Sequence, residues 1–302
     1  MTINLQTVQQ ADITNTRSYL HNLLAIRATE KGMQWLDQKL EQVSKAGAAK
    51  DFYLAFSAAP RFMGKSTLDP TEEELAAAAE LREGFYPANW TVDQTARSLL
   101  LLSLPQLDKE AFLEKVNMLF NTADMGELVA LYASLPLLPY PEAFADRAAE
   151  GIRTNMSNVL EAVTLENPYP ADFLSEGAWN QLVLKTLFVG KSLYRIYGLE
   201  RRANQALANT LSDYAHERWA AGRPVTPELW RTVGPFIDDN ILNDIRQLFE
   251  HPDEIQHEAA ALACSQSNHA GAEELLNQHP HLKEKIKSGS LTWDTVGKKA
   301  YV

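Results

Sequence analysis

Apolar residues recur at intervals of three and four along most of the chain, which is the spacing of one face of an α-helix. Helix starts are also marked. Thr71 is followed three residues later by Glu74, a capping box that predicts a helix over the alanine-rich stretch behind it. Asp124 and Glu127 repeat the pattern. No segment alternates apolar and polar residues for long, so the pattern predicts essentially no sheet.

Further signals separate the helical stretches from one another. Thr91 with Gln94 predicts another N-cap, and Thr226 before Pro227 predicts a cap with a first-turn proline. Prolines fall where helices must stop. They are Pro105, Pro136, Pro139, Pro168, Pro170, Pro224 and Pro235. We therefore predict about twelve to fourteen helices joined by short loops.

The C-terminal third differs from the rest in its pattern. Short amphipathic units follow one another there, and alanines 259–261 and 263 allow close helix packing. This spacing resembles HEAT or armadillo repeats. We predict an all-α, antiparallel helical array with solenoid character toward the C-terminus. Residues 1–225 would form the main domain, 226–288 HEAT-like helices packed on it, and 289–302 a mobile tail unless Trp293 docks it.

Composition supports the all-α prediction. Among the 302 residues, Leu (41) and Ala (39) far outnumber Val (13) and Ile (10), and β-branched residues favour strands. The one cysteine, Cys264, excludes an intramolecular disulfide and a cysteine-based zinc site. Its alanine-rich surroundings predict a small buried core residue rather than a nucleophile.

Charge narrows the classes of partner. A net charge of −11 argues against nucleic-acid binding and against adsorption to anionic lipid. Residues 147–223 carry 9 basic and 8 acidic groups, so an anionic ligand would bind there, unless the balance is mere compositional variation. The N-terminus does not resemble a secretory signal, and the longest apolar runs are too short for a transmembrane helix. These features predict a soluble, cytoplasmic protein.

Several familiar motifs are incomplete. Two Gly-Lys-Ser triplets, at 64–66 and 190–192, lack the glycine that a phosphate loop needs five residues earlier. His257-Glu258 begins a zinc motif, but Ala261 stands where the second histidine belongs. The histidines of the C-terminal third share no helix face, which favours surface roles. We expect no metal and no cofactor.

Polar residues of the central segment form the main candidate site. Lys185 interrupts an apolar run, and a buried lysine needs a partner or an exposed head group. Other cations, amides and a histidine project from neighbouring helices. The candidate ligand-binding residues are Arg153, Asn155, Asn180, Lys185, Arg195, Arg202, His216 and Arg218. The competing interpretation is a set of salt bridges to Glu161, Glu176 and Asp213 that joins the helices.

The expected packing places His216 beside Asn180. Residues 176–190 and 201–221 are apolar consecutive helices, and a short turn between them would make them antiparallel. The end of the second helix would then lie near the start of the first. Arg218 and a protonated His216 would also be favoured at a helix C-terminus without any ligand.

Several long segments resemble the EboA-domain family. They are NWTVDQTARSLLLLSL (89–104), NTADMGELVALYASLPLLPYPE (121–142), AEGIRTNMSNVLEAVTLENPYP (149–170), EGAWNQLVLKTLF (176–188) and DYAHERWAAGRPVTPELWRTVG (213–234), with FYLAFSAAPRFMGKSTL (52–68) fitting the N-terminal part. The resemblance implies a place in bacterial Ebo gene clusters, which are associated with secondary metabolism and with movement of a pigment precursor toward the periplasm. It implies no catalytic residues.

Two hypotheses of function follow. The first is a helical binding or assembly protein in a secondary-metabolite biosynthesis and export pathway, with other Ebo-pathway proteins or a small anionic metabolite as partners. The alternative is an enzyme that acts on an anionic or isoprenoid-derived small molecule through the central polar residues. One enclosed, polar-lined cavity in the central segment would favour the enzyme.

Overall fold

The protein is described by a computed structural model that covers residues 10–45 and 49–301. Across these ranges it is helical, and an isolated bridge between Thr67 and Thr91 is the nearest approach to a strand. The all-α prediction is confirmed. Seventeen α-helices and six 3-10 helices occur in these ranges, more than expected, because short stretches such as α10 (Tyr169–Phe173) form separate helices.

The chain divides between Ser175 and Glu176 into two compact units. The boundary expected at residue 225 does not coincide with this division, because the segments on either side of 225 pack together: Trp219 stacks on Trp230. No helix within the described residues is both long enough and apolar enough to cross a bilayer.

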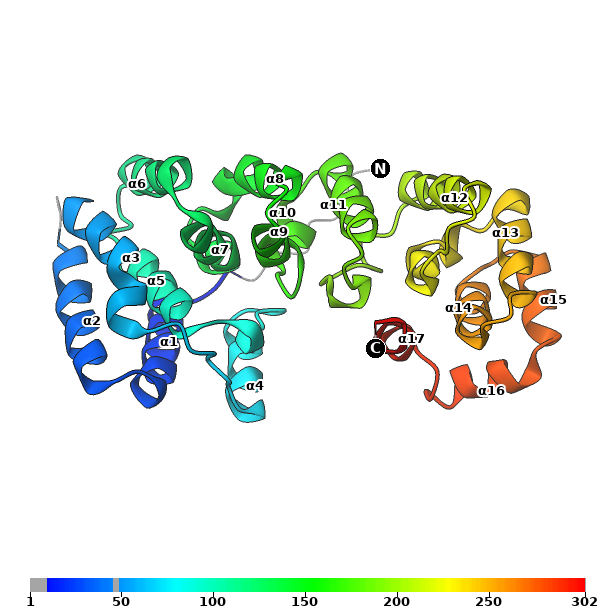
Figure 1. Cartoon of the computed structure of the whole chain (residues 1–302), viewed down its shortest axis with the longest axis horizontal. Helices are drawn as coiled ribbons and strands as arrows, with labels where there is room; N and C mark the ends of the chain where they lie inside the picture. The colour runs from blue at the N-terminus through cyan, green and yellow to red at the C-terminus, as the bar shows by residue number, and fades with distance from the viewer. Residues whose placement is uncertain (1–9, 46–48, 302) are drawn as a thin grey trace. The chain divides into compact units, whose positions relative to one another are not determined.

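The N-terminal unit is built around one fully buried helix, α5 (Val92–Leu102), which packs against α1, α2, α3 and α7 (Figure 1). Even Arg97 is buried in it, held by Asp93 and by the carbonyl of Phe56. The other helices are α1 (Ile13–Arg27), α2 (Glu30–Val43), α3 (Ala49–Met63), α4 (Glu72–Leu81), η1 (Pro87–Asn89), α6 (Lys109–Thr122), α7 (Met125–Ser134), η2 (Leu135–Leu137), η3 (Pro141–Phe144), α8 (Ala145–Arg153), α9 (Ser157–Thr164) and α10.

The predicted caps of this unit are present. Thr71 and Glu74 form a reciprocal capping box at the start of α4, and Asp124 and Glu127 form another at α7. Thr91 accepts the hydrogen bond expected at the start of α5. Each cap satisfies backbone N–H groups that have no partner inside the helix.

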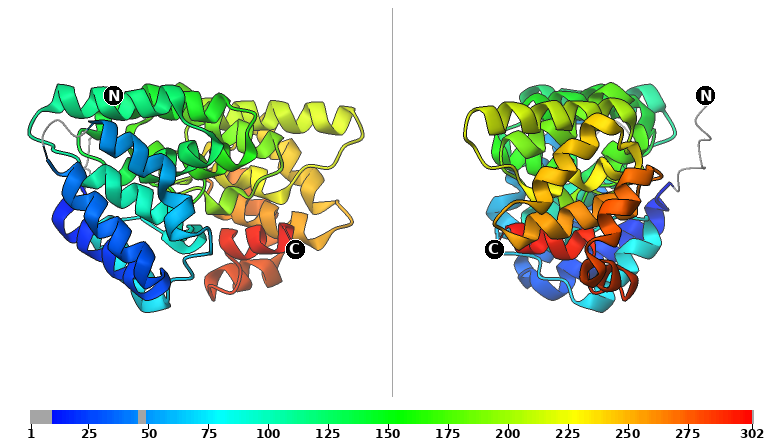
Figure 2. Two further views of the ribbon diagram at one scale, coloured as in Figure 1. Left: turned by 60° about the vertical axis from the view of Figure 1, so that its left-hand side comes forward. Right: turned by 90° about the vertical axis from the view of Figure 1, so that its right-hand side faces the viewer.

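The C-terminal unit gathers around α14 (Glu254–Ser265), which packs against α13, α15, α16, α17 and η5 (Figure 2). Ala259, Ala260, Ala261 and Ala263 are fully buried, so the predicted close packing is confirmed. The remaining helices are α11 (Glu176–Phe188), η4 (Leu193–Arg195), α12 (Gln205–Ala220), η5 (Pro227–Thr232), η6 (Gly234–Phe236), α13 (Asp239–Phe249), α15 (Ala270–Asn277), α16 (Pro280–Lys287) and α17 (Trp293–Ala300). The HEAT-like repeat character stays a prediction.

Two local expectations need correction. Thr226 makes no capping bond, and the segment behind it is the 3-10 helix η5 rather than an α-helix. The tail forms helix α17 instead of a mobile segment, because Trp293 docks: it is buried, and its indole N–H donates to Gln266 at 3.1 Å. Thr292 and Thr295 cap the start of this helix.

Candidate functional site

The structure brings two of the predicted site residues, Asn180 and Arg202, to the same place. Asn180 lies in the first turns of α11, and Arg202 lies just before α12. The amides of Asn180 and Asn204 exchange hydrogen bonds of 3.2 and 2.8 Å. The guanidinium of Arg202 lies 5.1 Å from the ring centroid of buried Trp179, and its carbonyl accepts from Asn204. These contacts connect the N-terminal end of α12 to the first turns of α11.

His216 does not lie beside Asn180, contrary to the antiparallel arrangement expected for α11 and α12. Asn180 contacts Asn204, which is the N-cap of α12, and His216 follows twelve residues later. That separation is about 18 Å along the helix axis. The expectation failed because residues 189–204, which include η4, are long enough to return the chain before α12 begins.

His216 and Arg218 have structural partners at the far end of α12. The Nε2 atom of His216 lies 2.6 Å from Asp244 of α13, whose other oxygen accepts from Ser212 at 2.7 Å. The guanidinium of Arg218 donates twice to the carbonyl of Pro224, at 3.1 and 3.0 Å. Asp213 and the other expected acids are not the recorded partners of these two side chains.

The remaining candidates are dispersed. Arg153 ends α8, and Asn155 follows it; both are exposed and belong to the N-terminal unit. Lys185 lies half-buried on α11, and Arg195 is the last residue of η4. A ligand role for these residues stays a prediction, and so does the enzyme hypothesis, which was based on the central polar residues as a group.

A cavity of about 690 Å³ lies in the C-terminal unit, at the end of α12. Its apolar walls come from Trp219, Pro224 and Val225 on one side and from Leu248 and Ile255 on the other. We call it the Trp219 cavity. Its volume falls within the range of small-molecule sites, about 300–1,000 Å³.

Gln256 belongs to the lining of the Trp219 cavity and fixes part of its wall. The residue is only 7% exposed, and its Nε2 atom donates to the carbonyl of Val225 at 2.9 Å. Its Oε1 atom is enclosed by the surrounding atoms and has no hydrogen-bond partner among the described residues. Sequence reasoning missed this residue. The available signal was its place, four and seven residues before Ala260 and Ala263, on an otherwise apolar helix face.

Some of the charged side chains that line the cavity have hydrogen-bond or ion-pair partners in the protein, and one does not. Lys299 of α17 is paired with Glu258, at 2.7 Å, and Asp253 caps α14 by accepting from the Ile255 N–H. His251 accepts from the backbone of Asp253 at 3.1 Å. Arg223 is exposed, and its side chain has no hydrogen bond or ion pair with any residue that the structure describes, so its guanidinium is open to solvent at the cavity.

Two of the predicted residues support this cavity from behind. Trp219 is stacked on fully buried Trp230, with centroids 5.9 Å apart, and His216 lies 5.9 Å from Trp219 on α12. Arg218 holds the Pro224 segment that forms part of the wall. His216 and Arg218 therefore contact residues of the cavity wall, although they do not line it.

Glu228 of η5 contacts both η4 and α17, the helix that contributes Lys299 and Ala300 to the cavity lining. It is fully buried, and it accepts the Leu193 N–H at 2.9 Å. A Cβ atom at Gly297 of α17 would lie 2.5 Å from the Glu228 Oε1, so glycine permits this approach. Burial raises the pKa of Glu228 to about 7, and the guanidinium of Arg231, 3.8 Å away, opposes the shift only in part.

Replacing Glu228 with glutamine should remove a pH dependence of stability. The carboxyl of Glu228 has a higher pKa in the folded state than in the unfolded state, where the value is 4.5. Its contribution to the free energy of unfolding is therefore complete below pH 4.5 and is lost as the pH rises toward about 7. The loss amounts to roughly 3 kcal/mol. Urea unfolding at pH 5 to 8 should show a shallower decline for Glu228→Gln than for the unmodified chain. Glu200→Gln, at a more exposed partner of Arg231, is the control; parallel curves for all three proteins would refute the prediction.

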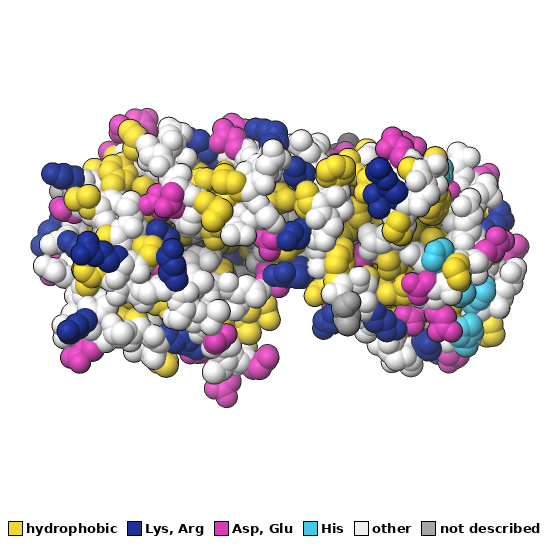
Figure 3. Space-filling model, in the orientation of Figure 1, with side chains coloured by type: hydrophobic (Ala, Val, Ile, Leu, Met, Phe, Trp, Pro, Cys, Tyr) yellow, Lys and Arg dark blue, Asp and Glu magenta, His cyan; other side chains and the backbone are white. Residues whose placement is uncertain are grey.

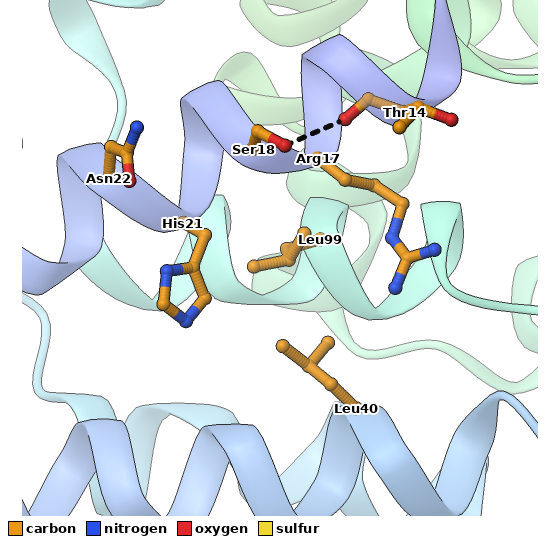
Figure 4. Close-up of a pocket in the computed structure, with 7 residues that line it drawn as sticks. All are labelled: Thr14, Arg17, Ser18, His21, Asn22, Leu40 and Leu99. Carbon is orange, nitrogen blue, oxygen red and sulfur yellow. Dashed lines mark hydrogen bonds between the residues drawn. The ribbon is translucent and has the colours of Figure 1, made fainter.

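A second, smaller cavity of about 310 Å³ lies in the N-terminal unit, among α1, α2 and α5. Figure 4 shows Arg17 and His21 extending from α1 toward Leu40 of α2, whereas Asn22 points away. His21 is paired with Asp37 at 2.7 Å, and no buried unsatisfied group lines this space. Within the described residues, no set of three or more acidic, histidine or cysteine side chains is placed to hold a metal ion.

The comparisons with known proteins give one positive result. The model of the family described as "Metabolite traffic protein EboA" matches residues 16–234. No curated protein and no solved structure matches the chain. The matched range includes Trp219, Arg223 and Val225 of the cavity and ends before α13. Because the match covers well over half of the sequence, this chain belongs to the EboA family.

Proposed function

We propose that this chain is a binding protein that holds a small metabolite in the Trp219 cavity. The family's association with metabolite traffic supports a cargo of this kind. The observation that carries the proposal is the cavity itself: about 690 Å³, with apolar walls and with the charged side chains of Arg223 and Asp253 in its lining. Clefts of this size with a few convergent polar groups are typical of small-molecule sites.

The wider role that we propose is handling and assembly in the cytoplasm. The chain would pass a precursor between proteins of a bacterial secondary-metabolite biosynthesis and export pathway on its way toward the periplasm. Arrays of helices expose extended surfaces that suit protein partners. Other Ebo-pathway proteins would be those partners, and the helices of the C-terminal unit, if they form a HEAT-like array, would supply the surface.

Native mass spectrometry tests the cavity. Tagged protein recovered from the producing bacterium should carry a small molecule that adds to the mass of the chain. Ile255→Trp, which fills the cavity with a larger side chain, should reduce the occupied fraction at least tenfold. Ile286→Trp, a half-buried isoleucine of α16 outside the lining, should retain the ligand. Absence of any adduct, or equal adducts in both variants, would contradict the proposal.

The same recovery tests the assembly role separately. Other proteins of the pathway should co-purify with the tagged chain at low salt. If none is recovered over a range of salt and detergent conditions while the small molecule remains bound, the binding proposal stands and the assembly role falls.

A further inference from the structure

Helix α17 packs over the side chain of Glu228 and also contributes to the Trp219 cavity. Its residues Lys299 and Ala300 belong to the cavity lining. Trp293 and Val296 are buried and fix the helix on the C-terminal unit. A change in the charge of Glu228 therefore acts on α17, and through α17 on the wall of the cavity.

The surroundings of Glu228 suit a neutral carboxyl better than a carboxylate. Its Oε2 atom accepts the Leu193 N–H at 2.9 Å. Its Oε1 atom has no hydrogen-bond partner among the described residues and lies against the backbone of Gly297 in α17. Removal from water penalises the charged form of a carboxyl, and here the docked helix supplies no donor to the second oxygen.

Arg231 compensates Glu228 only weakly, because its guanidinium also serves two other carboxylates. Its Nε atom donates to Glu200 at 2.5 Å, and its Nη2 atom donates to Asp294 of α17 at 2.7 Å. The Nη1 atom lies 3.8 Å from Oε1 of Glu228 and makes no hydrogen bond. One positive charge is thus shared among three acids, of which Glu228 is the fully buried one.

The groups that neighbouring elements bring to Glu228 offset its burial only in part. Burial raises the pKa of its carboxyl to about 7, and Arg231, the backbone N–H groups of Leu193 and Tyr194, and Tyr301 oppose this shift. The hydroxyl of Tyr301 itself donates to the carbonyl of Lys191, at 2.9 Å. Other charged side chains on the helices packed against η5 have partners of their own. They are Lys299 of α17 with Glu258 of α14, and His216 and Arg218 of α12 with Asp244 and the Pro224 carbonyl.

We propose that α17 is a pH-dependent lid of the Trp219 cavity, docked while Glu228 is neutral and released more often once Glu228 ionises. Release would take Lys299 and Ala300 out of the lining and would let water solvate the carboxylate. The contribution of Glu228 to docking is complete below pH 4.5 and is lost as the pH rises toward about 7. The lid role rests on the proposed function of the cavity, whereas the release of α17 does not.

Hydrogen exchange of the α17 amides measures the release without any ligand. After correction for the intrinsic pH dependence of exchange, their protection in the unmodified chain should fall at least about tenfold more than that of α13 between pH 5 and pH 8. In Glu228→Gln, which cannot ionise, this difference should stay below about twofold. Glu200→Gln removes a more exposed partner of Arg231 and should keep the difference.

Each outcome decides between the release of α17 and a purely structural role of Glu228. Protection of α17 that changes no more than that of α13 overturns the proposal, whether or not Glu228→Gln folds. A pH dependence of α17 that persists in a folded Glu228→Gln variant does the same.

Native mass spectrometry then separates the lid role from the proposed function. The small-molecule adduct of protein recovered from native cells should be lost at least about tenfold faster at pH 8 than at pH 5, in step with the release of α17. Equal rates of loss overturn the lid role. If an adduct is present but α17 shows no pH-dependent release, the lid fails and the binding function stands. If α17 is released but no adduct is found, the binding function fails, and the lid role fails with it.

Discussion

Replacing Arg82 with methionine should lower the free energy of unfolding of the N-terminal unit by about 3–5 kcal/mol. Arg82 follows α4, and its guanidinium is paired with Asp172 of α10; their side chains are 4% and 6% exposed. The substitution keeps most of the apolar stem and removes the charge. Asp172 would then be a buried carboxylate without its guanidinium partner, and an uncompensated charge in the interior is strongly unfavourable.

A double variant distinguishes loss of the pair from loss of packing. Arg82→Met combined with Asp172→Leu removes both charges, so much of the lost stability should return. Lys45→Met is the exposed control, because Lys45 and Glu41 are paired on the surface, and it should cost less than about 1 kcal/mol. Urea unfolding measures all of these variants. A single variant within 1 kcal/mol of the unmodified chain, or a double variant no more stable than the single one, would contradict the account.

Replacing Trp230 with alanine should destabilise the C-terminal unit by about 3–5 kcal/mol. The side chain is fully buried in η5 and is stacked on Trp219 at an angle of 23°. Its removal leaves a void that a compact unit fills only in part. Trp219 would lose the ring that is stacked on it, so the fraction of the recovered chain that carries a small molecule in the Trp219 cavity should fall as well.

Trp219→Ala separates these two effects. Trp219 is only half-buried, so its removal should cost less than half as much stability as Trp230→Ala, while the fraction of the chain that carries the small molecule should fall at least as far. Unfolding in urea and native mass spectrometry of the recovered protein give the two readings. If Trp230→Ala costs less than 1 kcal/mol, Trp230 does not support the wall as described.

The parts of the fold that the sequence predicts are those decided within a few residues. Thr71 and Glu74 cap α4 because every atom of that motif lies within one turn of helix. The burial of Cys264 followed from its alanine neighbours, and burial raises the pKa of its thiol to about 12. Thr226 looks like the same kind of signal as Thr71 but makes no capping bond, and the segment behind it is a 3-10 helix.

Contacts between distant segments carry no such local signal. The pairing of Arg82 with Asp172 spans 90 residues, and neither residue stands out in its own stretch of sequence. The arrangement of α11 and α12 depended on the path of residues 189–204, which periodicity does not describe. Short turns predict antiparallel neighbours, but a connection of this length allows other arrangements.

The site residues predicted from the sequence meet the Trp219 cavity only at the end of α12. His216 lies beside Trp219, and Arg218 holds the Pro224 segment, but neither lines the cavity, and their role in ligand binding stays a prediction. Gln256 was missed because its place in the cavity lining depends on its hydrogen bond to Val225, 31 residues away, which no local pattern shows. Polar residues that look conspicuous in sequence were mostly satisfied by neighbours.

The central claim is that the Trp219 cavity is a ligand site, and a crystal structure of the chain purified from the producing bacterium tests it most directly. The account predicts density for a small molecule in this cavity, in contact with Trp219 and Ile255. An empty cavity in protein whose mass spectrum shows a bound small molecule, or that molecule bound elsewhere on the chain, would contradict it.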